Sequence, residues 1–162
     1  MDTRDLGMGD LSALGPVAEW PVWRLFMLAT RMAGPAWGRL LEQHGVSPAG
    51  FFVLRMLHGE DGLRAGEVAR RLLTSPATVT SVADTLERHG QLERRRDGAD
   101  RRAVLLHITD AGRNLVQVTS HDMAPEVLEL FGGAAPEDEP AVRRFLLSLI
   151  GRFDAYLKGD RP

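Results

Sequence analysis

The chain contains no cysteine among its 162 residues, and this absence excludes several kinds of site. Disulfide frameworks, thiolate zinc sites, thiol catalysis and cysteine-based oxidant sensing all need the missing thiol. Long hydrophobic runs are missing too, because Arg24 and Arg31 interrupt the best candidate for a membrane span. Asp2 and Asp5 make the N-terminus unlike a signal peptide. We therefore expect a cytoplasmic protein without a membrane segment.

Lysine is nearly absent, because 19 of the 20 basic residues are arginine and only Lys158 is lysine. Arginine suits planar, bidentate recognition of phosphate or carboxylate, although a GC-rich genome would give the same composition. Motifs of catalysis are also missing, since the chain has neither a Gly-x-Ser-x-Gly sequence nor a phosphate-binding glycine-rich loop. The five histidines are scattered, with no pair four residues apart. The sequence therefore predicts no enzyme, no cofactor and no metal site.

What the chain does have is enough apolar material for a core, with 44% hydrophobic residues, 26% charged residues and a net charge of −2. At this length, folding can bury roughly 70% of the surface of the unfolded chain, so packing alone can hold the fold. Residues 1–15 are rich in glycine and aspartate and have few large apolar side chains. We expect this segment to be a flexible N-terminal tail.

Beyond the tail, apolar residues return mainly at helical spacing. Ser47-Pro48 and Ser75-Pro76 each combine an N-cap residue with proline at the first helical position. In the segment between them, Val68, Leu72 and Leu73 are expected to face inward. Helices are predicted over residues 16–44 (one long bent helix or two short ones, given Pro21 and Pro35), 48–59, 64–73, 75–89, from 110 onward and after 136.

Two short segments have strand character instead, residues 92–96 and 103–108, and the sequence between them favours a turn. The predicted fold is therefore mainly α with a small β-hairpin. Three helices followed by a hairpin and another helix, with two helices packed around the turn at Thr74-Ser75, are typical of a winged helix-turn-helix domain, which binds DNA.

The helix from residue 75 has the two faces that a recognition helix needs, one apolar and one small and polar. Its outward residues include no Arg, Asn or Gln, the side chains that make bidentate contacts with bases, so direct readout of sequence should be modest. The outward set comprises Ser75, Ala77, Thr78, Thr80, Ser81, Asp84 and Thr85, and we expect all of them except Asp84 to contact DNA.

The hairpin is strongly basic, with Arg94, Arg95 and Arg96 before the turn and Arg101 and Arg102 after it. A basic wing can lie along the phosphates or insert an arginine into the minor groove. Alternatively, such a charge run is a solvated strand edge that discourages aggregation. A further alternative function is a winged-helix protein-interaction module that does not bind DNA, although an acidic wing would suit that function better.

The stretch from Val46 to Val116 resembles the MarR family of bacterial transcriptional regulators. The resemblance is carried by residues 75–80 (SPATVT), 86–90 (LERHG), 97–103 (DGADRRA) and 108–113 (ITDAGR). It implies a homodimer on a palindromic DNA site, with the two recognition helices in successive major grooves. It also implies that Asp100 steadies Arg102, which would enter the minor groove. Pro76 and Gln91 depart from the usual pattern of the family.

The resemblance divides the chain into a winged helix-turn-helix domain at 46–109 and a helical dimerisation region made of 16–45 and 110–162. The last helix supports a homodimer independently, because its apolar stripe is wide for a domain of this size, although a plain core helix remains an alternative. The stripe comprises Val142, Phe145, Leu146, Leu149, Ile150, Phe153, Tyr156 and Leu157.

The resemblance also raises the question of a small ligand, because many members of the family release DNA when an aromatic, often anionic, molecule binds between the dimerisation helices and the winged domain. This chain has apolar residues, one cation and one imidazole for such a pocket. An alternative is that these aromatic residues form the dimer core. The candidate pocket residues are Trp20, Trp23, Arg24, Met27, His44 and Phe52. We expect a sequence-specific repressor that such a ligand releases from DNA.

Overall fold

The computed structural model describes residues 15–98, 100 and 102–159. Nearly all of the predicted N-terminal tail, and Arg101 of the predicted DNA contacts, lie outside the described residues. The chain divides into two compact units with the boundary between Asp122 and Met123, and each is described by itself. No helix in the described ranges has both the length and the hydropathy of a membrane span.

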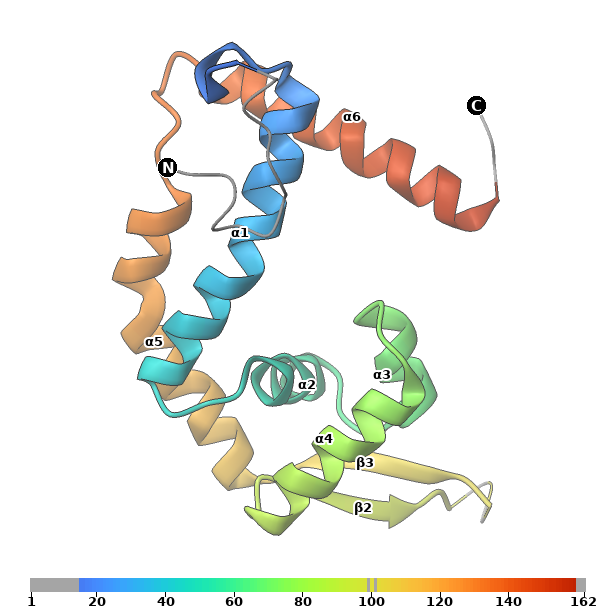
Figure 1. The fold of residues 1–162 in the computed structure, drawn as a ribbon. Coiled ribbons are helices and arrows are strands. Elements are labelled where there is room, and N and C mark those ends of the chain that lie inside the picture. Colours follow the sequence, from blue (N-terminus) through green and yellow to red (C-terminus); the bar gives the residue numbers. More distant parts are fainter. Residues whose placement is uncertain (1–14, 99, 101, 160–162) are drawn as a thin grey trace. The chain divides into compact units, whose positions relative to one another are not determined.

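The first unit begins with a short 3-10 helix at Val17–Glu19 and the long helix α1 at Val22–Gln43 (Figure 1). Of the two possibilities that the sequence left open, the single helix is found, with Pro35 inside it. Helices α2 (Pro48–Gly59), α3 (Ala65–Arg71) and α4 (Pro76–Arg88) follow, and α5 (Asp110–Phe131) begins in this unit. The expected fold class is confirmed, since helices predominate around one small antiparallel sheet.

The starts of α2 and α4 are fixed by the predicted caps. The Ser47 hydroxyl accepts a hydrogen bond from the Gly50 backbone N–H at 3.2 Å. The Ser75 hydroxyl accepts one from the Thr78 N–H at 3.0 Å, and proline follows both serines. Because a cap satisfies an N–H group that the helix itself leaves unpaired, each Ser-Pro pair determines where its helix begins.

The sheet has three strands in the order β1-β3-β2, where β2 is Leu92–Arg96 and β3 is Val104–Ile108. Strand β1 (Leu63–Arg64) pairs with Leu106 and Leu105 of β3, and the sequence did not predict it. The expected third helix therefore begins one residue later, at Ala65, and it ends at Arg71. Leu73 is 80% exposed with a backbone φ of 52°, so the prediction that it faces inward was wrong. The turn places it in the left-handed region, which directs it away from the core.

The core of the first unit lies where α2, α3 and α4 meet the sheet. Leu54, Leu57, Val68 and Ala83 are completely buried there, and Leu106 of β3 is nearly so. Leu92 and Ile108 close the cluster from the two long strands. This packing fixes the inner face of α4 and the base of the hairpin against the same set of side chains.

The second unit contains the end of α5 and helix α6 (Glu139–Lys158). Gly159 ends α6 in a left-handed conformation with φ of 84°, which suits a glycine. No residue of α6 is buried. The predicted apolar stripe is largely exposed, with Ile150, Tyr156 and Leu157 each more than half accessible.

Candidate nucleic-acid interface

Helices α3 and α4 form the predicted helix-turn-helix. The chain turns at residues 72–75, where the Thr74 N–H donates to the Ala69 carbonyl at 3.0 Å before the Ser75 cap starts α4. Val79, Ala83 and Leu86 are buried on the inner face of α4. Six residues of the predicted outward set are exposed and the seventh, Thr85, is partly buried. The helix therefore has one face packed on the core and a polar face directed outward.

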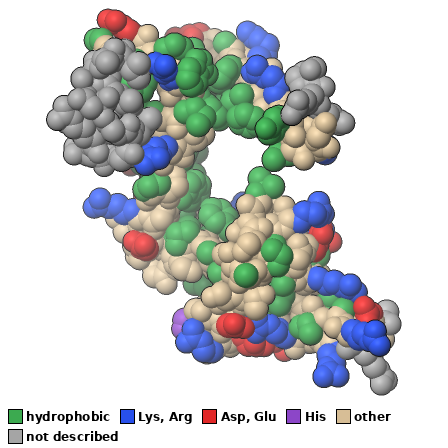
Figure 2. All heavy atoms as spheres, turned by 45° about the vertical axis from the view of Figure 1, so that its right-hand side comes forward, with side chains coloured by type: hydrophobic (Ala, Val, Ile, Leu, Met, Phe, Trp, Pro, Cys, Tyr) green, Lys and Arg blue, Asp and Glu red, His purple; other side chains and the backbone are tan. Residues whose placement is uncertain are grey.

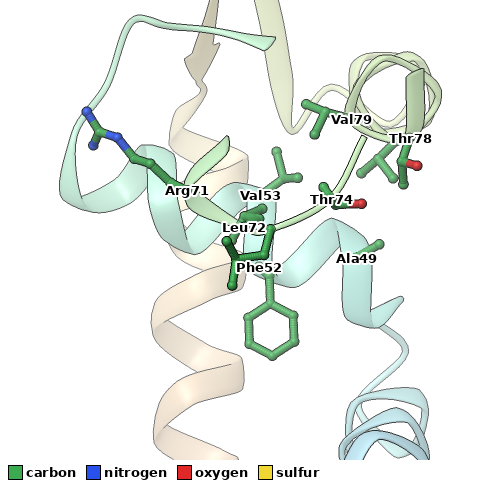
Figure 3. A pocket seen from close by; sticks show the side chains of 10 residues that line it. Ala49, Phe52, Val53, Arg71, Leu72, Thr74, Thr78 and Val79 are labelled. Atoms are coloured by element: carbon green, nitrogen blue, oxygen red, sulfur yellow. The ribbon is translucent and has the colours of Figure 1, made fainter. Parts of the chain in front are cut away.

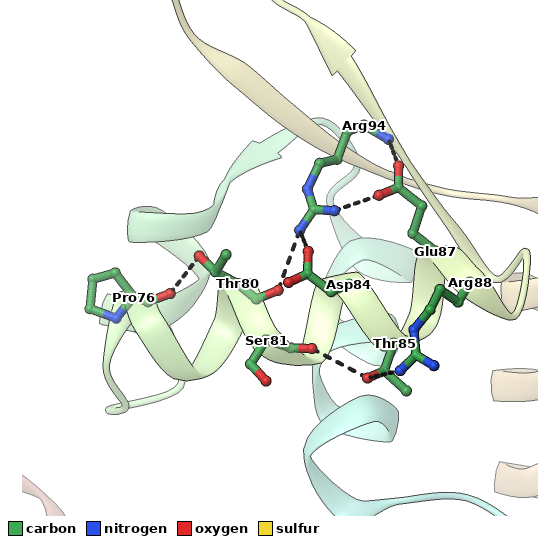
Figure 4. Close-up of polar contacts among 8 residues, drawn as sticks. All are labelled: Pro76, Thr80, Ser81, Asp84, Thr85, Glu87, Arg88 and Arg94. Carbon is green, nitrogen blue, oxygen red and sulfur yellow. Dashed lines mark hydrogen bonds and ion pairs between the residues drawn. The ribbon is translucent and has the colours of Figure 1, made fainter.

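The hydroxyl groups on the outer face of α4 differ in how far they are already hydrogen-bonded (Figure 4). Thr80 Oγ1 donates to the Pro76 carbonyl at 2.9 Å, and Thr85 Oγ1 donates to the Ser81 carbonyl at 3.3 Å. Arg88 donates to Thr85 Oγ1 at 3.0 Å. Within the described residues, the Ser81 hydroxyl makes no hydrogen bond, so it can both donate to and accept from a base edge.

The wing arginines, which the sequence grouped together, lie in different surroundings. Arg94 of β2 turns toward α4, where its Nη2 donates to Asp84 Oδ1 at 2.6 Å and to the Thr80 carbonyl at 3.3 Å, while its Nη1 pairs with Glu87 (Figure 4). Partial burial lowers the pKa of Arg94, but hydrogen bonds to the two carboxylates outweigh it and leave that pKa above its ordinary value. Arg95 pairs with Glu93 on its own strand.

The outer part of the wing is more open. Arg96 and Arg102 are exposed, and Arg96 has no ion pair within the described part of the chain. The Arg102 backbone N–H donates to Asp100 Oδ1 at 3.1 Å, so Asp100 contacts the residue with which the resemblance pairs it. Arg96 and Arg102 therefore carry charges that DNA phosphates can approach.

The sequence reasoning missed Arg64, which holds the wing tip from the opposite edge of the sheet. Its Nη2 lies 3.5 Å from Asp97 and 3.4 Å from Asp100. Its position in β1, which pairs with β3, brings it beside the turn. A two-residue strand gives no periodic signal, so the sequence offered no sign of this contact.

A second missed residue, Asp61, ties the end of β3 to the loop after α2. Its carboxylate accepts from the Ile108 N–H at 2.9 Å and lies 3.2 Å from His107 Nδ1 and 3.4 Å from Arg113 Nη2. Partial burial raises the pKa of Asp61, but hydrogen bonds from Ile108, His107 and Gly62 outweigh it and hold that pKa below its ordinary value. The carboxylate thereby fixes the point where the sheet passes into α5.

The six candidate ligand-pocket residues lie in different surroundings. Trp20 is buried, with its Nε1 donating to the Gly15 carbonyl at 3.2 Å, while Met27 is exposed and His44 half-buried. The Arg24 guanidinium lies over the exposed Trp23 ring, 5.1 Å from its centroid. Phe52 makes edge-to-face contacts with Trp37 and Phe51 at centroid distances of 6.2 and 5.9 Å.

A cleft of about 410 Å³ lies between α2 and the helix-turn-helix, and Phe52 is the candidate that lines it (Figure 3). The cationic residue in the lining of this cleft, Arg71, is already paired, with Nη1 2.5 Å from Glu60 and Nε 2.6 Å from Glu67. Hydrogen bonds to these two carboxylates raise the pKa of Arg71. The rest of the lining is mainly apolar and comprises Ala49, Val53, Leu72, Leu73, Thr74, Thr78, Val79 and Val82.

Comparison with known proteins agrees with this geometry. The model of the MarR family matches residues 46–104, which include α2, the helix-turn-helix and β2. The uncharacterized HTH-type transcriptional regulator YkoM of Bacillus subtilis is 30% identical over 118 residues, 73% of this chain and 77% of that protein. The HTH-type transcriptional repressor MdtR of B. subtilis is 39% identical over 72 residues, 44% of this chain and 46% of that protein.

Among solved structures, Bordetella bronchiseptica BpsR is 27% identical and superposes with a TM-score of 0.67. The match covers 83% of this chain and 97% of BpsR. The sequence match to YkoM and the family match thus agree with the arrangement of helices and wing. The chain belongs to the MarR family of DNA-binding, winged helix-turn-helix transcriptional regulators.

Proposed function

We propose that this regulator is a homodimeric repressor that binds a palindromic operator, with α4 of each subunit in a major groove and each wing over the adjacent minor groove. MarR regulators are not enzymes, so its function rests on binding. The observation that carries the proposal is the exposed polar face of α4 beside an arginine-rich hairpin. Figure 2 shows basic side chains around the end of the unit where the wing lies.

Each part of the interface has a different role in the proposal. Thr78 and Ser81 on α4 supply hydroxyl groups for base edges, and Ser75, Ala77, Thr80 and Thr85 surround them. Arg96 and Arg102 supply charge for the phosphates and the minor groove. Because hydroxyl groups accept several base patterns, most of the affinity should come from the charges, and sequence preference should be moderate.

The exposed apolar residues support a dimer. The apolar stripe of α6 is unburied, and α1 exposes Val22, Trp23 and Met27, each more than half accessible. Isolated proteins rarely expose such apolar surfaces, whereas subunit interfaces bury them. We therefore assign 16–45 and 110–162 to the dimerisation region and 46–109 to the DNA-binding domain.

The repressor assignment is supported by the similarity to MdtR, which is a repressor. A small-molecule signal is supported by the similarity to BpsR, whose DNA binding is regulated by 6-hydroxynicotinic acid. In the present chain Arg24, stacked on Trp23, is the better partner for an aromatic carboxylate. Arg71 in the cleft of Figure 3 is a poorer one, because Glu60 and Glu67 already neutralise it.

We infer that ligand binding would act by changing the separation of the two recognition helices. A dimer reads two half-sites about 34 Å apart, one turn of DNA, so a changed separation weakens both contacts together. This coupling needs no ligand contact with DNA. It needs a ligand that binds more tightly to a dimer conformation in which the two recognition helices cannot reach both half-sites.

The proposal is tested by mobility shift with the purified protein and DNA from upstream of its own gene, over a salt series and with a panel of aromatic acids. We expect a tight complex whose affinity falls steeply with salt, and release by at least one acid. Light scattering of the wild type and of Ile150→Asp tests the dimer, since an aspartate within the stripe should dissociate it. Absence of a complex with every fragment at low salt would contradict the proposal and favour a protein-interaction module.

A further inference from the structure

Arg94 differs from the other described wing arginines in what its guanidinium contacts. Its side chain is 26% exposed, whereas that of Arg95, the next residue along the strand, is 62% exposed. The contacts of Arg94 all lead back to α4, and its backbone N–H adds a fourth bond to Glu87 Oε1 at 3.1 Å. One residue of β2 thus joins strand and recognition helix through both its side chain and its main chain.

The position of Arg94 in the sheet explains this orientation. Arg94 lies opposite Leu106 of β3, which is buried, so its side chain starts on the face of the sheet that carries the core. Arg96 starts on the same face but lies opposite the exposed Val104, farther along the hairpin. Of these two arginines, Arg94 is the one that pairs with carboxylates of α4 within the described residues.

The carboxylates that Arg94 holds are themselves on the recognition helix. Asp84 belongs to the outward face, where a free negative charge would repel DNA phosphates. Asp84 and Glu87 are three residues apart and therefore neighbours on the helix surface. The planar guanidinium offers several donors in fixed directions, so it can bridge both groups and the Thr80 carbonyl at once, which a lysine ammonium does less well.

We propose that Arg94 is a positioning residue for DNA binding and not a phosphate ligand. It locks the base of the wing to α4, so that the outer face of α4 and Arg102 at the wing tip keep the separation needed to enter adjacent grooves. It also neutralises Asp84 on the face that approaches DNA. This inference rests on the proposed function, because it assumes that helix and wing engage the duplex together.

The opposite assignment makes a different prediction. If Arg94 moved to a phosphate on binding, it would first have to leave two carboxylates and a helix carbonyl. Weakening its hold on α4 would then free the arginine and tighten DNA binding. Removing the charge of Asp84 would tighten binding for a second reason, because it lessens repulsion of the phosphates. The sign of the effect of Asp84→Asn therefore separates the two assignments.

The experiment measures affinity for one duplex, isolated from a random-sequence pool with the wild-type protein, by fluorescence anisotropy at fixed salt. The variants are Arg94→Met, Asp84→Asn and the double variant. We expect each single change to weaken binding roughly tenfold and the double change to weaken it no more than Arg94→Met does, because both break the same contact and the double variant has no unpaired carboxylate at position 84. Multiplicative effects, or tighter binding by Asp84→Asn, would overturn the proposal.

Arg95→Met, alone and combined with Asp84→Asn, is the matched control. Arg95 carries the same charge on the same strand but pairs with Glu93, so its effect should multiply with that of Asp84→Asn. Hydroxyl-radical footprinting adds a readout that a general loss of stability would not give. Arg94→Met should lose the minor-groove protection of the wing while keeping the protection that reports α4, whereas equal loss of both would refute positioning.

The outcomes remain distinct when a variant fails. If Arg94→Met does not fold, as judged by thermal unfolding, Asp84→Asn still decides by its sign, since it replaces an exposed carboxylate by an amide of the same shape. If the wild-type protein selects no duplex from the pool, the proposed function fails. If the wild type binds tightly but the effects of Arg94→Met and Asp84→Asn multiply in the double variant, the proposed function stands and only the positioning role of Arg94 is refuted.

Discussion

Gly112→Ala should destabilise the protein although it places a better helix former in α5. Gly112 is buried in the first turn of α5, where the helix crosses the loop before β2. A Cβ atom built on this residue would lie 2.2 Å from the Gln91 carbonyl oxygen and 2.8 Å from Ile108 Cγ1. The carbonyl cannot easily withdraw, because it accepts a hydrogen bond from the Thr109 N–H at 3.2 Å.

Two opposing effects set the size of this change. Alanine in place of glycine within a helix is worth about 1 kcal/mol in favour of the folded state. Forcing an extra methyl group into a packed site costs about 1–3 kcal/mol, and a clash with backbone belongs at the upper end. The net loss should be about 1–2 kcal/mol, which lowers the melting temperature by roughly 2–8 °C for a chain of this size.

Gly66→Ala in α3 is the matched control, because a Cβ there meets no atom within 4 Å. It should leave stability unchanged or raise it by up to about 1 kcal/mol. Both variants and the wild type are unfolded in urea at one protein concentration, since dimerisation would make the midpoint depend on concentration. If Gly112→Ala were as stable as Gly66→Ala, the close approach of α5 to Gln91 would not be the rigid contact inferred here.

Three further predictions concern single contacts. Arg102→Ala should weaken DNA binding by about 1–3 kcal/mol while light scattering shows an unchanged oligomeric state; unchanged affinity would remove the wing tip from the interface. Asp61 has a lowered pKa, so its stabilisation is present above its ordinary value of 3.8 and is lost as pH falls through the folded value. Asp61→Asn should therefore make the free energy of unfolding fall less steeply as the pH is lowered. An unchanged pH dependence would show that Asp61 does not cause the loss of stability in acid. Ser47→Ala should cost about 1 kcal/mol in urea unfolding because the Gly50 N–H loses its cap, and no loss would show that water replaces it.

The features of the fold that the sequence predicted are those that depend on near neighbours. The starts of α2 and α4 follow from Ser-Pro pairs, each of which acts within three residues of the chain. The hairpin follows from a turn between two short strands. Strand β1 was missed because its two residues become a strand only by pairing with Leu105 and Leu106, some forty positions away. No local pattern contains that information.

The outward face of α4 was predictable for the same reason, since helical spacing alone decides which residues are opposite the buried Val79, Ala83 and Leu86. The candidate ligand pocket was harder to predict. It required aromatic residues from several segments to converge, whereas the described unit places Phe52 on a cleft lined by α2 and the helix-turn-helix. Composition indicates that the chain has enough aromatic and apolar residues to line a pocket, but it does not show which of these side chains line the same one.

The three consecutive arginines of β2 show why charge in a sequence is a poor measure of charge at an interface. Counted along the chain they contribute equally, yet Arg94 is neutralised by α4 and Arg95 by Glu93, while Arg96 has no ion pair within the described residues. Strand alternation separates Arg95 from its neighbours, and Arg96 lies farther along the hairpin than Arg94. The salt dependence of DNA binding should therefore reflect Arg96 and the wing tip more than the total number of arginines. A slope that fell as much for Arg94→Met as for Arg96→Met, with wing protection retained, would show that the pairing seen in the free protein does not persist on DNA.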